Sequence, residues 1–176
     1  MVTEQDKTLE AVQFAIQMEI DGREFYLKAS QKSSNELGEK LFQSLAAEED
    51  IHRQKFVKIY DTLRNKKAWP VIIPQMDSGK SPTTVFAQAI EETSSDAKAP
   101  ATELDAVKTA MDMENKTYDF YQSRGKTATY DAEKDFYRSL AAEESTHHLI
   151  LLDYYEYLKD PAGWFVKKEH HSLDGG

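Results

Sequence analysis

The feature of this chain that most constrains its fold is an internal repeat. Residues 44–52 (SLAAEEDIH) resemble residues 139–147 (SLAAEESTH) at an offset of 95 positions. Two upstream pairs share the same offset, namely Met18-Glu19 with Met113-Glu114 and Phe25-Tyr26 with Phe120-Tyr121. A chance resemblance has no reason to preserve one spacing at distant sites, so these matches indicate that a unit of two segments has been duplicated.

Each segment of the repeat has the pattern of a long helix. The first carries a core-facing stripe at intervals of three, four or seven residues, formed by Leu9, Val12, Ile16, Glu19 and Tyr26. In the second segment the stripe again includes acidic and imidazole side chains, with members Leu41, Leu45, Glu49, His52, Phe56 and Ile59. Polar residues that could bind a ligand are therefore expected on faces that should be buried.

The helix ends are predicted from caps and breakers. The second helix should begin at a capping box formed by Ser33 and Glu36 and continue to about residue 66. The third should run from a Thr102 cap to residue 125, and the fourth from about residue 129 to residue 159, just before Asp160-Pro161. Each is roughly 25 to 30 residues long, or about 35–45 Å at 1.5 Å per residue.

The connections predict an all-α four-helix bundle made of two hairpins. Short turns near residues 33–34 and 126–128 require antiparallel partners within the hairpins, at about 4–66 and 102–160. The crossover at 67–101 is long enough to return along the bundle, and its residues 85–90 (VFAQAI) suggest a short helix. No composition shift divides the chain, so residues 1–160 are expected to form one domain, followed by a C-terminal tail at 161–176.

The numbering places four glutamates at one height in the bundle. Position 34, in the first turn, is midway between Glu19 and Glu49, and position 129, at the second turn, is midway between Glu114 and Glu144. Residues equidistant from the turn of an antiparallel hairpin lie at the same level along its axis. If the two hairpins pack with approximate twofold symmetry, all four carboxylates meet in the core.

The histidines suggest what compensates this buried charge. His52 and His147 each follow a glutamate by three residues, so each imidazole projects beside its glutamate. Burying four carboxylates alone would be very costly, whereas two divalent cations would balance their charge. Oxygen ligands with one imidazole per metal suit two Fe ions, and Mn or Zn is also possible. The predicted metal ligands are Glu19, Glu49, His52, Glu114, Glu144 and His147.

Composition excludes several other functions. The chain has no cysteine, which leaves carboxylate and imidazole as its strong metal ligands and rules out disulfides and iron–sulfur clusters. A net charge of −9 with scattered Lys and Arg argues against nucleic acid as a partner. Neither a signal peptide nor an apolar run long enough to span a membrane is evident, so we expect a cytoplasmic protein without a membrane partner.

The full set of motifs resembles the ferritin-like diiron carboxylate proteins, and most closely the rubrerythrin family. The matching elements are Glu19, Glu49-Asp50-Ile51-His52, Glu114 and Glu144-Ser145-Thr146-His147, within residues 9 to 160. This resemblance implies a ferritin-like bundle with Glu49 and Glu144 as bridging ligands and Glu19 and Glu114 as terminal ones. It also implies an oxidoreductase that acts on H2O2 or O2, with peroxide reduction favoured.

Two departures from the family bear on the electron supply. Rubrerythrins usually carry a further carboxylate three residues after the third-helix glutamate, and this chain has Thr117 there. They usually also carry a four-cysteine rubredoxin module, which a chain without cysteine cannot contain, so an external electron-donor protein is expected.

Two alternative functions stay open, a ferroxidase that handles or stores iron and a structural bundle braced by zinc. We expect a homo-oligomer, with a dimer favoured.

Residues close to the six expected ligands have plainer interpretations. Tyr26 and Tyr121 lie two turns from Glu19 and Glu114 on the same faces, where they could donate hydrogen bonds to ligands or carry a transient radical. The plainer interpretation is that their rings pack in the core with an anchored hydroxyl. Glu48 and Glu143 each precede a predicted bridging glutamate by one residue, about 100° around the helix. They are expected at the surface or in support of ligands, and His148 is not expected to bind metal.

Overall fold

The computed structural model describes residues 3–66, 68–71, 79–93 and 99–173. In these ranges every secondary-structure element is a helix, as an all-α fold requires. The helices are α1 (Glu4–Lys32), α2 (Glu36–Lys66), α3 (Pro82–Glu91), α4 (Ala101–Thr127), α5 (Asp131–Lys159) and α6 (Pro161–Leu173). Among them, none is both long and apolar enough to cross a lipid bilayer.

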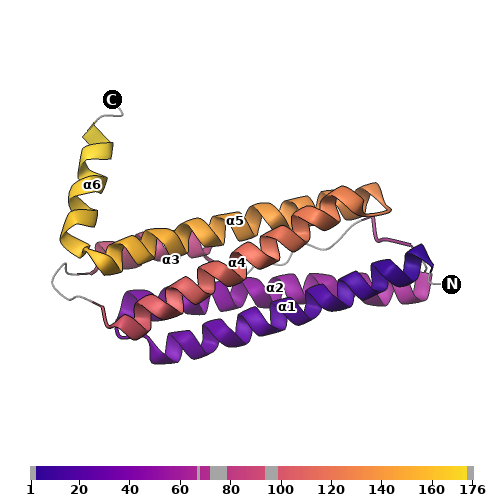
Figure 1. Ribbon diagram of the computed structural model, residues 1–176, viewed down its shortest axis with the longest axis horizontal. Coiled ribbons are helices and arrows are strands. Elements are labelled where there is room, and N and C mark those ends of the chain that lie inside the picture. Colours follow the sequence, from indigo (N-terminus) through magenta and orange to yellow (C-terminus); the bar gives the residue numbers. More distant parts are fainter. Residues whose placement is uncertain (1–2, 67, 72–78, 94–98, 174–176) are drawn as a thin grey trace.

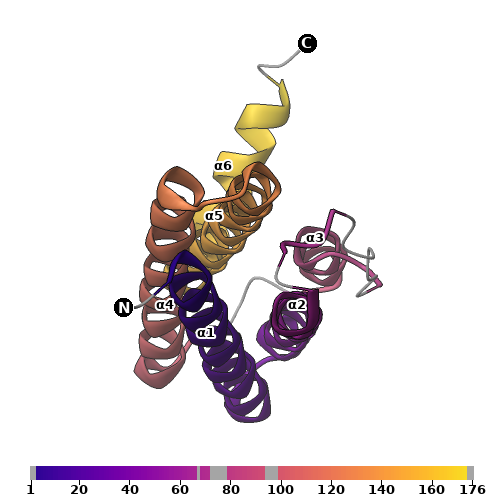
Figure 2. The same ribbon diagram turned by 90° about the vertical axis from the view of Figure 1, so that its right-hand side faces the viewer.

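Four long helices form the predicted ferritin-like bundle from two hairpins, α1 with α2 and α4 with α5 (Figure 1). The first hairpin lies below the second in Figure 1, and α3 lies beside α2 and α5. In the same view α4 begins at the end of the bundle opposite the start of α1. The end-on view in Figure 2 shows α1 next to α4, so each hairpin places one helix against its counterpart in the other.

The first helix has a full N-terminal cap. The Thr3 side chain accepts a hydrogen bond from the Asp6 backbone N–H, and the Asp6 carboxylate accepts one from the Thr3 backbone N–H. This reciprocal capping box satisfies amides that the helix itself leaves unpaired. It fixes the start of α1 at Glu4, and the helix then continues without interruption to Lys32.

The predicted capping box at the start of α2 is wrong. Asn35 caps this helix, because its Oδ1 accepts a hydrogen bond from the Gly38 backbone N–H at 2.8 Å. The Ser33 hydroxyl instead donates to the Asn35 carbonyl and to the Glu103 carboxylate, at 3.0 and 2.6 Å. Two further starts also differ, since α4 begins at Ala101 after Pro100 without a Thr102 cap, and α5 begins at Asp131. Tertiary contacts at the turns decide these ends, which local spacing alone does not reveal.

The short helix expected in the crossover is present as α3. Ser81 caps it through the Thr84 backbone N–H, and Pro82 occupies its first turn. Phe86, Ala89 and Ile90 are buried along one face, which packs on α2 and α5. Much of the rest of the crossover lies outside the described residues.

Residues 161–173, expected as a tail, form α6. The Asp160 carboxylate accepts a hydrogen bond from the Gly163 backbone N–H, which caps the new helix. Trp164 then packs against Tyr157 and Phe86, with ring centroids 5.9 and 6.3 Å apart. Its indole N–H donates to Asp153 at 2.8 Å, so the start of α6 is attached to the bundle.

The apolar core is divided into two clusters, one on each side of a polar layer. Along α1, Ala15 belongs to one cluster and Tyr26 to the other, and Glu19 lies between them. Along α2 the order is Ala46 and then Phe56, again in different clusters, with Glu49 and His52 in between. Large buried side chains therefore enclose the polar layer above and below, and this fixes it within the bundle.

Candidate metal centre

The structure brings all six predicted ligand residues together in the polar layer. Their side chains come from the four long helices, and their exposed fractions lie between 0% and 4%. They are Glu19 on α1, Glu49 and His52 on α2, Glu114 on α4, and Glu144 and His147 on α5. Isolated carboxylates are almost never buried to this extent, so this layer requires compensating charge.

The ligand atoms of these residues form two groups that share two members. Glu19, Glu49, His52 and Glu144 each offer one atom, and these atoms lie within 4.8 Å of one another. A second group of the same kind consists of Glu49, Glu114, Glu144 and His147. Glu49 and Glu144 belong to both groups, as bridging carboxylates of a dinuclear site would.

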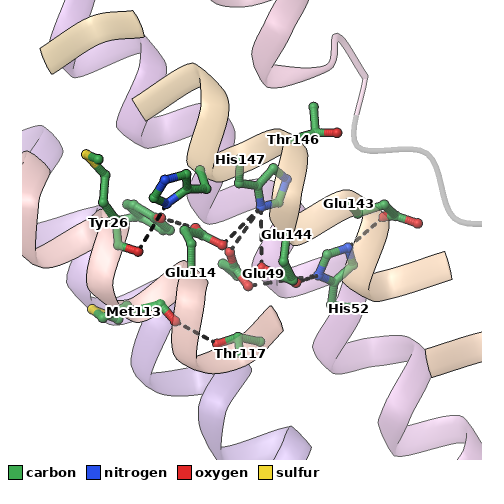
Figure 3. Close-up of polar contacts among 12 residues, drawn as sticks. Tyr26, Glu49, His52, Met113, Glu114, Thr117, Glu143, Glu144, Thr146 and His147 are labelled. Atoms are coloured by element: carbon green, nitrogen blue, oxygen red, sulfur yellow. Dashed lines mark hydrogen bonds and ion pairs between the residues drawn. The ribbon is translucent and has the colours of Figure 1, made fainter. Parts of the chain in front are cut away.

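Each histidine points its Nδ1 into one group. His52 Nδ1 lies 3.2 Å from Glu144 Oε1 and 3.5 Å from Glu19 Oε2. His147 Nδ1 lies 3.6 Å from Glu114 Oε2 and 3.7 Å from both Glu49 Oε1 and Glu144 Oε2. Figure 3 shows Glu49, Glu114 and Glu144 converging between the two imidazoles, whose ring centroids are 5.9 Å apart and nearly parallel.

Unpaired atoms show that the layer fits metal ions. Several buried oxygen and nitrogen atoms have no hydrogen-bond partner among the described residues, and those of the two groups are Glu19 Oε2, His52 Nδ1, Glu114 Oε2, both Glu144 oxygens and His147 Nδ1. Buried polar atoms are normally satisfied, so a cluster of orphans aimed at two points indicates missing partners. Carboxylate and imidazole donors at one imidazole per group suit two divalent cations.

The electrostatics of the metal-free layer lead to the same interpretation. Burial, followed by the charges of Glu144 and Glu19, raises the pKa of Glu49 well above its ordinary value, and burial raises the pKa of Glu114 to about 8. Burial lowers the pKa of His147, but the charge and hydrogen bond of Glu114 outweigh it and raise the value to about 10. Protons therefore neutralise this layer when no metal is present, and metal binding must displace them.

The two tyrosines support ligands of the opposite hairpin. Tyr26 on α1 donates a hydrogen bond to Glu114 on α4, and Tyr121 on α4 donates one to Glu19 on α1. Both bonds cross between the hairpins. Burial, followed by the adjacent carboxylate charges, raises the pKa of both phenols well above the ordinary value, so they stay protonated donors.

One of the two neighbouring glutamates supports a histidine. Glu143 Oε2 lies 2.8 Å from His52 Nε2, so this carboxylate of α5 fixes the ring of a residue on α2 (Figure 3). The hydrogen bond with His52 opposes the effect of burial and lowers the pKa of Glu143. Glu48, Glu143 and His52 also form a third group of possible ligand atoms. His148 Nδ1 lies 3.4 Å from the Met111 carbonyl, outside all three groups.

A buried glutamate that the sequence analysis missed joins the hairpins near the first turn. Glu103 on α4 accepts hydrogen bonds from the Ser33 hydroxyl, the Ser34 backbone N–H and the Tyr154 hydroxyl, at 2.6, 2.7 and 2.9 Å. Its spacing could have revealed it, because it lies four and eleven residues before Val107 and Glu114 on one helical stripe.

Fold and site together define a class of protein. The chain is a ferritin-like four-helix bundle whose buried layer of four glutamates and two histidines fits a dinuclear metal site. The family model described as Rubrerythrin matches residues 10–155, which include all six residues, and the chain belongs to this family. Comparisons with curated proteins and with solved structures gave no match.

Proposed function

We propose that this protein is a diiron oxidoreductase that reduces hydrogen peroxide to water with electrons from a separate donor protein. The observation that carries the proposal is the pair of four-residue groups that share Glu49 and Glu144. Bound there, two iron ions would supply the two electrons that cleavage of the O–O bond requires. Membership of the rubrerythrin family supports redox chemistry at this centre.

Each ligand has a role in this proposal. Glu19 and His52 would hold one ion, Glu114 and His147 would hold the other, and Glu49 and Glu144 would be shared by both. Tyr26 and Tyr121 hold the terminal carboxylates in place through their hydrogen bonds.

A small cavity beside the centre favours a small oxidant. It measures about 20 Å³ and is lined by Met18, Gly22, Tyr26, Glu49, Met113, Glu114 and Thr117. This space accepts a molecule about the size of water, so H2O2 or O2 is a better match than an organic substrate. Thr117 donates its hydroxyl to the Met113 carbonyl at 3.1 Å and supplies no carboxylate at this position.

The test is stopped-flow mixing of the reduced, iron-loaded protein with H2O2 and, separately, with air-saturated buffer. We expect oxidation by peroxide to be at least ten times faster than oxidation by O2, with about two irons per chain. Equal rates would contradict peroxide reduction as the reaction.

Iron counting and sedimentation test the alternative functions on the same preparation. A hollow assembly with many irons per chain would instead indicate ferroxidation and storage, whereas a dimer with two irons would not. Absence of any reaction with iron, together with stability that depends on zinc, would favour a structural metal.

A further inference from the structure

The two tyrosines at the metal centre are equivalent in the repeat but have different neighbours. Tyr121 contacts Tyr137, with ring centroids 5.7 Å apart. The 95-residue offset relates Tyr26 to Tyr121 and Phe42 to Tyr137, and the Tyr26 and Phe42 centroids are 6.1 Å apart. The second hairpin thus places a phenol where the first places a phenyl ring.

The contacts of Tyr137 continue away from the centre. Its ring centroid lies 6.1 Å from that of Trp69, which follows the end of α2. Trp69 is 5% exposed, whereas Val71, two residues further along, is 91% exposed. Three adjoining rings, Tyr121, Tyr137 and Trp69, therefore connect a hydrogen-bond donor to Glu19 with the end of the bundle.

These three rings share one chemical property. Phenol and indole rings lose one electron far more readily than a phenyl ring does, so an electron can move stepwise between adjoining Tyr and Trp side chains. Phe42 interrupts any such path from Tyr26 in the first hairpin. Packing within the apolar core does not by itself require a hydroxyl at position 137.

We propose that Trp69, Tyr137 and Tyr121 form a one-electron relay that carries electrons from the end of α2 to the metal centre. The direction rests on the proposed function, since the chain needs an external donor. Once peroxide had oxidised the centre, Tyr121 would give it one electron and would pass its phenol proton to Glu19 Oε1, which accepts its hydrogen bond. Tyr137 would then reduce the oxidised Tyr121, which would take its proton back from Glu19.

The remaining steps, at Tyr137 and Trp69, return every ring to its starting state. Trp69 reduces the oxidised Tyr137, and a reduced one-electron carrier protein reduces Trp69. Each ring loses and regains one electron, and each phenol loses and regains one proton. The net change is one electron moved from the carrier to the centre, and two such transfers match one molecule of H2O2.

A polar cluster of Arg124 and Glu133 lies beside Tyr137. Arg124 pairs with Glu133 at 2.9 Å, and its guanidinium lies over the Tyr137 ring, 5.8 Å from the centroid. Four buried atoms here lack a hydrogen-bond partner among the described residues, namely Tyr137 Oη, Trp69 Nε1, Arg124 Nε and Glu133 Oε2. Glu133 is fully buried in this cluster without a hydrogen bond to Tyr137, and in the proposed relay it would hold the Tyr137 proton while that ring is oxidised.

The first experiment uses metal-free protein, so that it does not depend on the proposed reaction. Trp69 and Trp164 are the two tryptophans of the chain, and the Trp164→Phe variant leaves Trp69 alone. Azide radicals from pulse radiolysis oxidise the indole, and transient absorption follows the loss of the tryptophan radical and the growth of a tyrosyl radical. We expect first-order transfer at a rate independent of protein concentration.

Variants in the Trp164→Phe background test the route. Tyr137→Phe should slow the transfer at least tenfold, whereas Tyr60→Phe should leave its rate unchanged. Tyr60 also packs against this apolar cluster and is partly buried, which makes it the matched control. Circular dichroism establishes that each variant is folded. An unchanged rate in folded Tyr137→Phe, or no tyrosyl radical in the parent, would overturn the relay.

The second experiment reads the relay in the iron-loaded protein by peptide mass spectrometry. After peroxide treatment without a donor, we expect oxidation products at Trp69 in the wild type and at least fivefold less in Tyr137→Phe. Equal Trp69 oxidation in both would count against the relay. If the radical transfer fails while the protein still reduces peroxide, the relay alone is rejected. Intact transfer without peroxide reduction rejects the proposed function alone.

Discussion

His52 Nε2 and Glu143 Oε2 lie 2.8 Å apart across the boundary between the two hairpins. The carboxylate fixes the ring so that Nδ1 faces Glu144 and Glu19, the orientation that a metal ligand needs. A hydrogen bond of this kind also makes the imidazole a stronger ligand. The relationship therefore links the packing of the hairpins to the affinity of one half of the candidate centre.

Replacing Glu143 should weaken the binding of one metal ion more than that of the other. We expect Glu143→Gln to lower the affinity for the ion held by His52 by about 10–100-fold, as loss of such support usually does. Titration with iron or zinc, read by calorimetry, measures both binding steps. Asp112→Asn removes the same charge from an exposed position on α4 and should leave both steps unchanged. Equal affinity in wild type and Glu143→Gln would contradict the supporting role.

Variants of the shared and the unshared glutamates should bind different numbers of metal ions per chain. Glu144 belongs to both ligand groups, so Glu144→Gln should remove tight binding of both ions. Glu19 belongs to one group, so Glu19→Gln should retain about one ion per chain. Elemental analysis after gel filtration measures the difference. Two ions retained by Glu144→Gln would show that Glu144 is not a bridging ligand.

The metal-free protein should lose stability as the pH rises above neutrality. The folded state raises the pKa of His147 from 6.5 to about 10, so its contribution is complete below pH 6.5 and is lost as the pH approaches 10. The folded state also raises the pKa of Glu114 from 4.5 to about 8, so its contribution to stability is likewise lost as the pH rises, but at a lower pH.

Urea unfolding at pH 6.5 and pH 10 measures this change in the free energy of unfolding. The metal-free wild type should be less stable at pH 10, and a folded His147→Gln variant should show a smaller decrease. Zinc-loaded protein should not follow this trend, because the metal replaces the protons. Equal stability of the metal-free wild type at both pH values would contradict the raised pKa of His147.

Gly38 should tolerate no side chain at the first turn. An added Cβ would overlap Tyr154 Oη, Ser33 Oγ and Glu103 Oε1, the groups that join the two hairpins there. We expect Gly38→Ala to lower the free energy of unfolding by about 1–3 kcal/mol, the usual cost of overpacking.

Gly22 is the matched control for that substitution. A Cβ there would lie 3.5 Å from Glu49, an ordinary contact, and Ala is up to about 1 kcal/mol better than Gly within a helix. Gly22→Ala should therefore keep or increase stability. Thermal and urea unfolding of both variants measure the contrast, and similar losses at both sites would refute the steric argument.

Local pattern and repeat spacing determined much about this protein. The stripes at helical spacing predicted the four long helices and the buried positions of Glu19 and Glu114, because the helical period fixes which residues share a face. The 95-residue offset and the turn positions predicted that carboxylates from both hairpins would meet. That these residues bind metal stays a prediction, which the stoichiometry experiments test.

Only the tertiary structure decided how the hairpins face each other. It paired Tyr26 with Glu114 and Tyr121 with Glu19, placed Glu143 beside His52, and used Asn35 rather than Ser33 as a cap. The physical reason is that sequence spacing constrains only residues that are close together along the chain. Helical spacing within a segment orients each side chain about its own axis, but the relative shift and rotation of two packed hairpins choose which side chains across the interface meet.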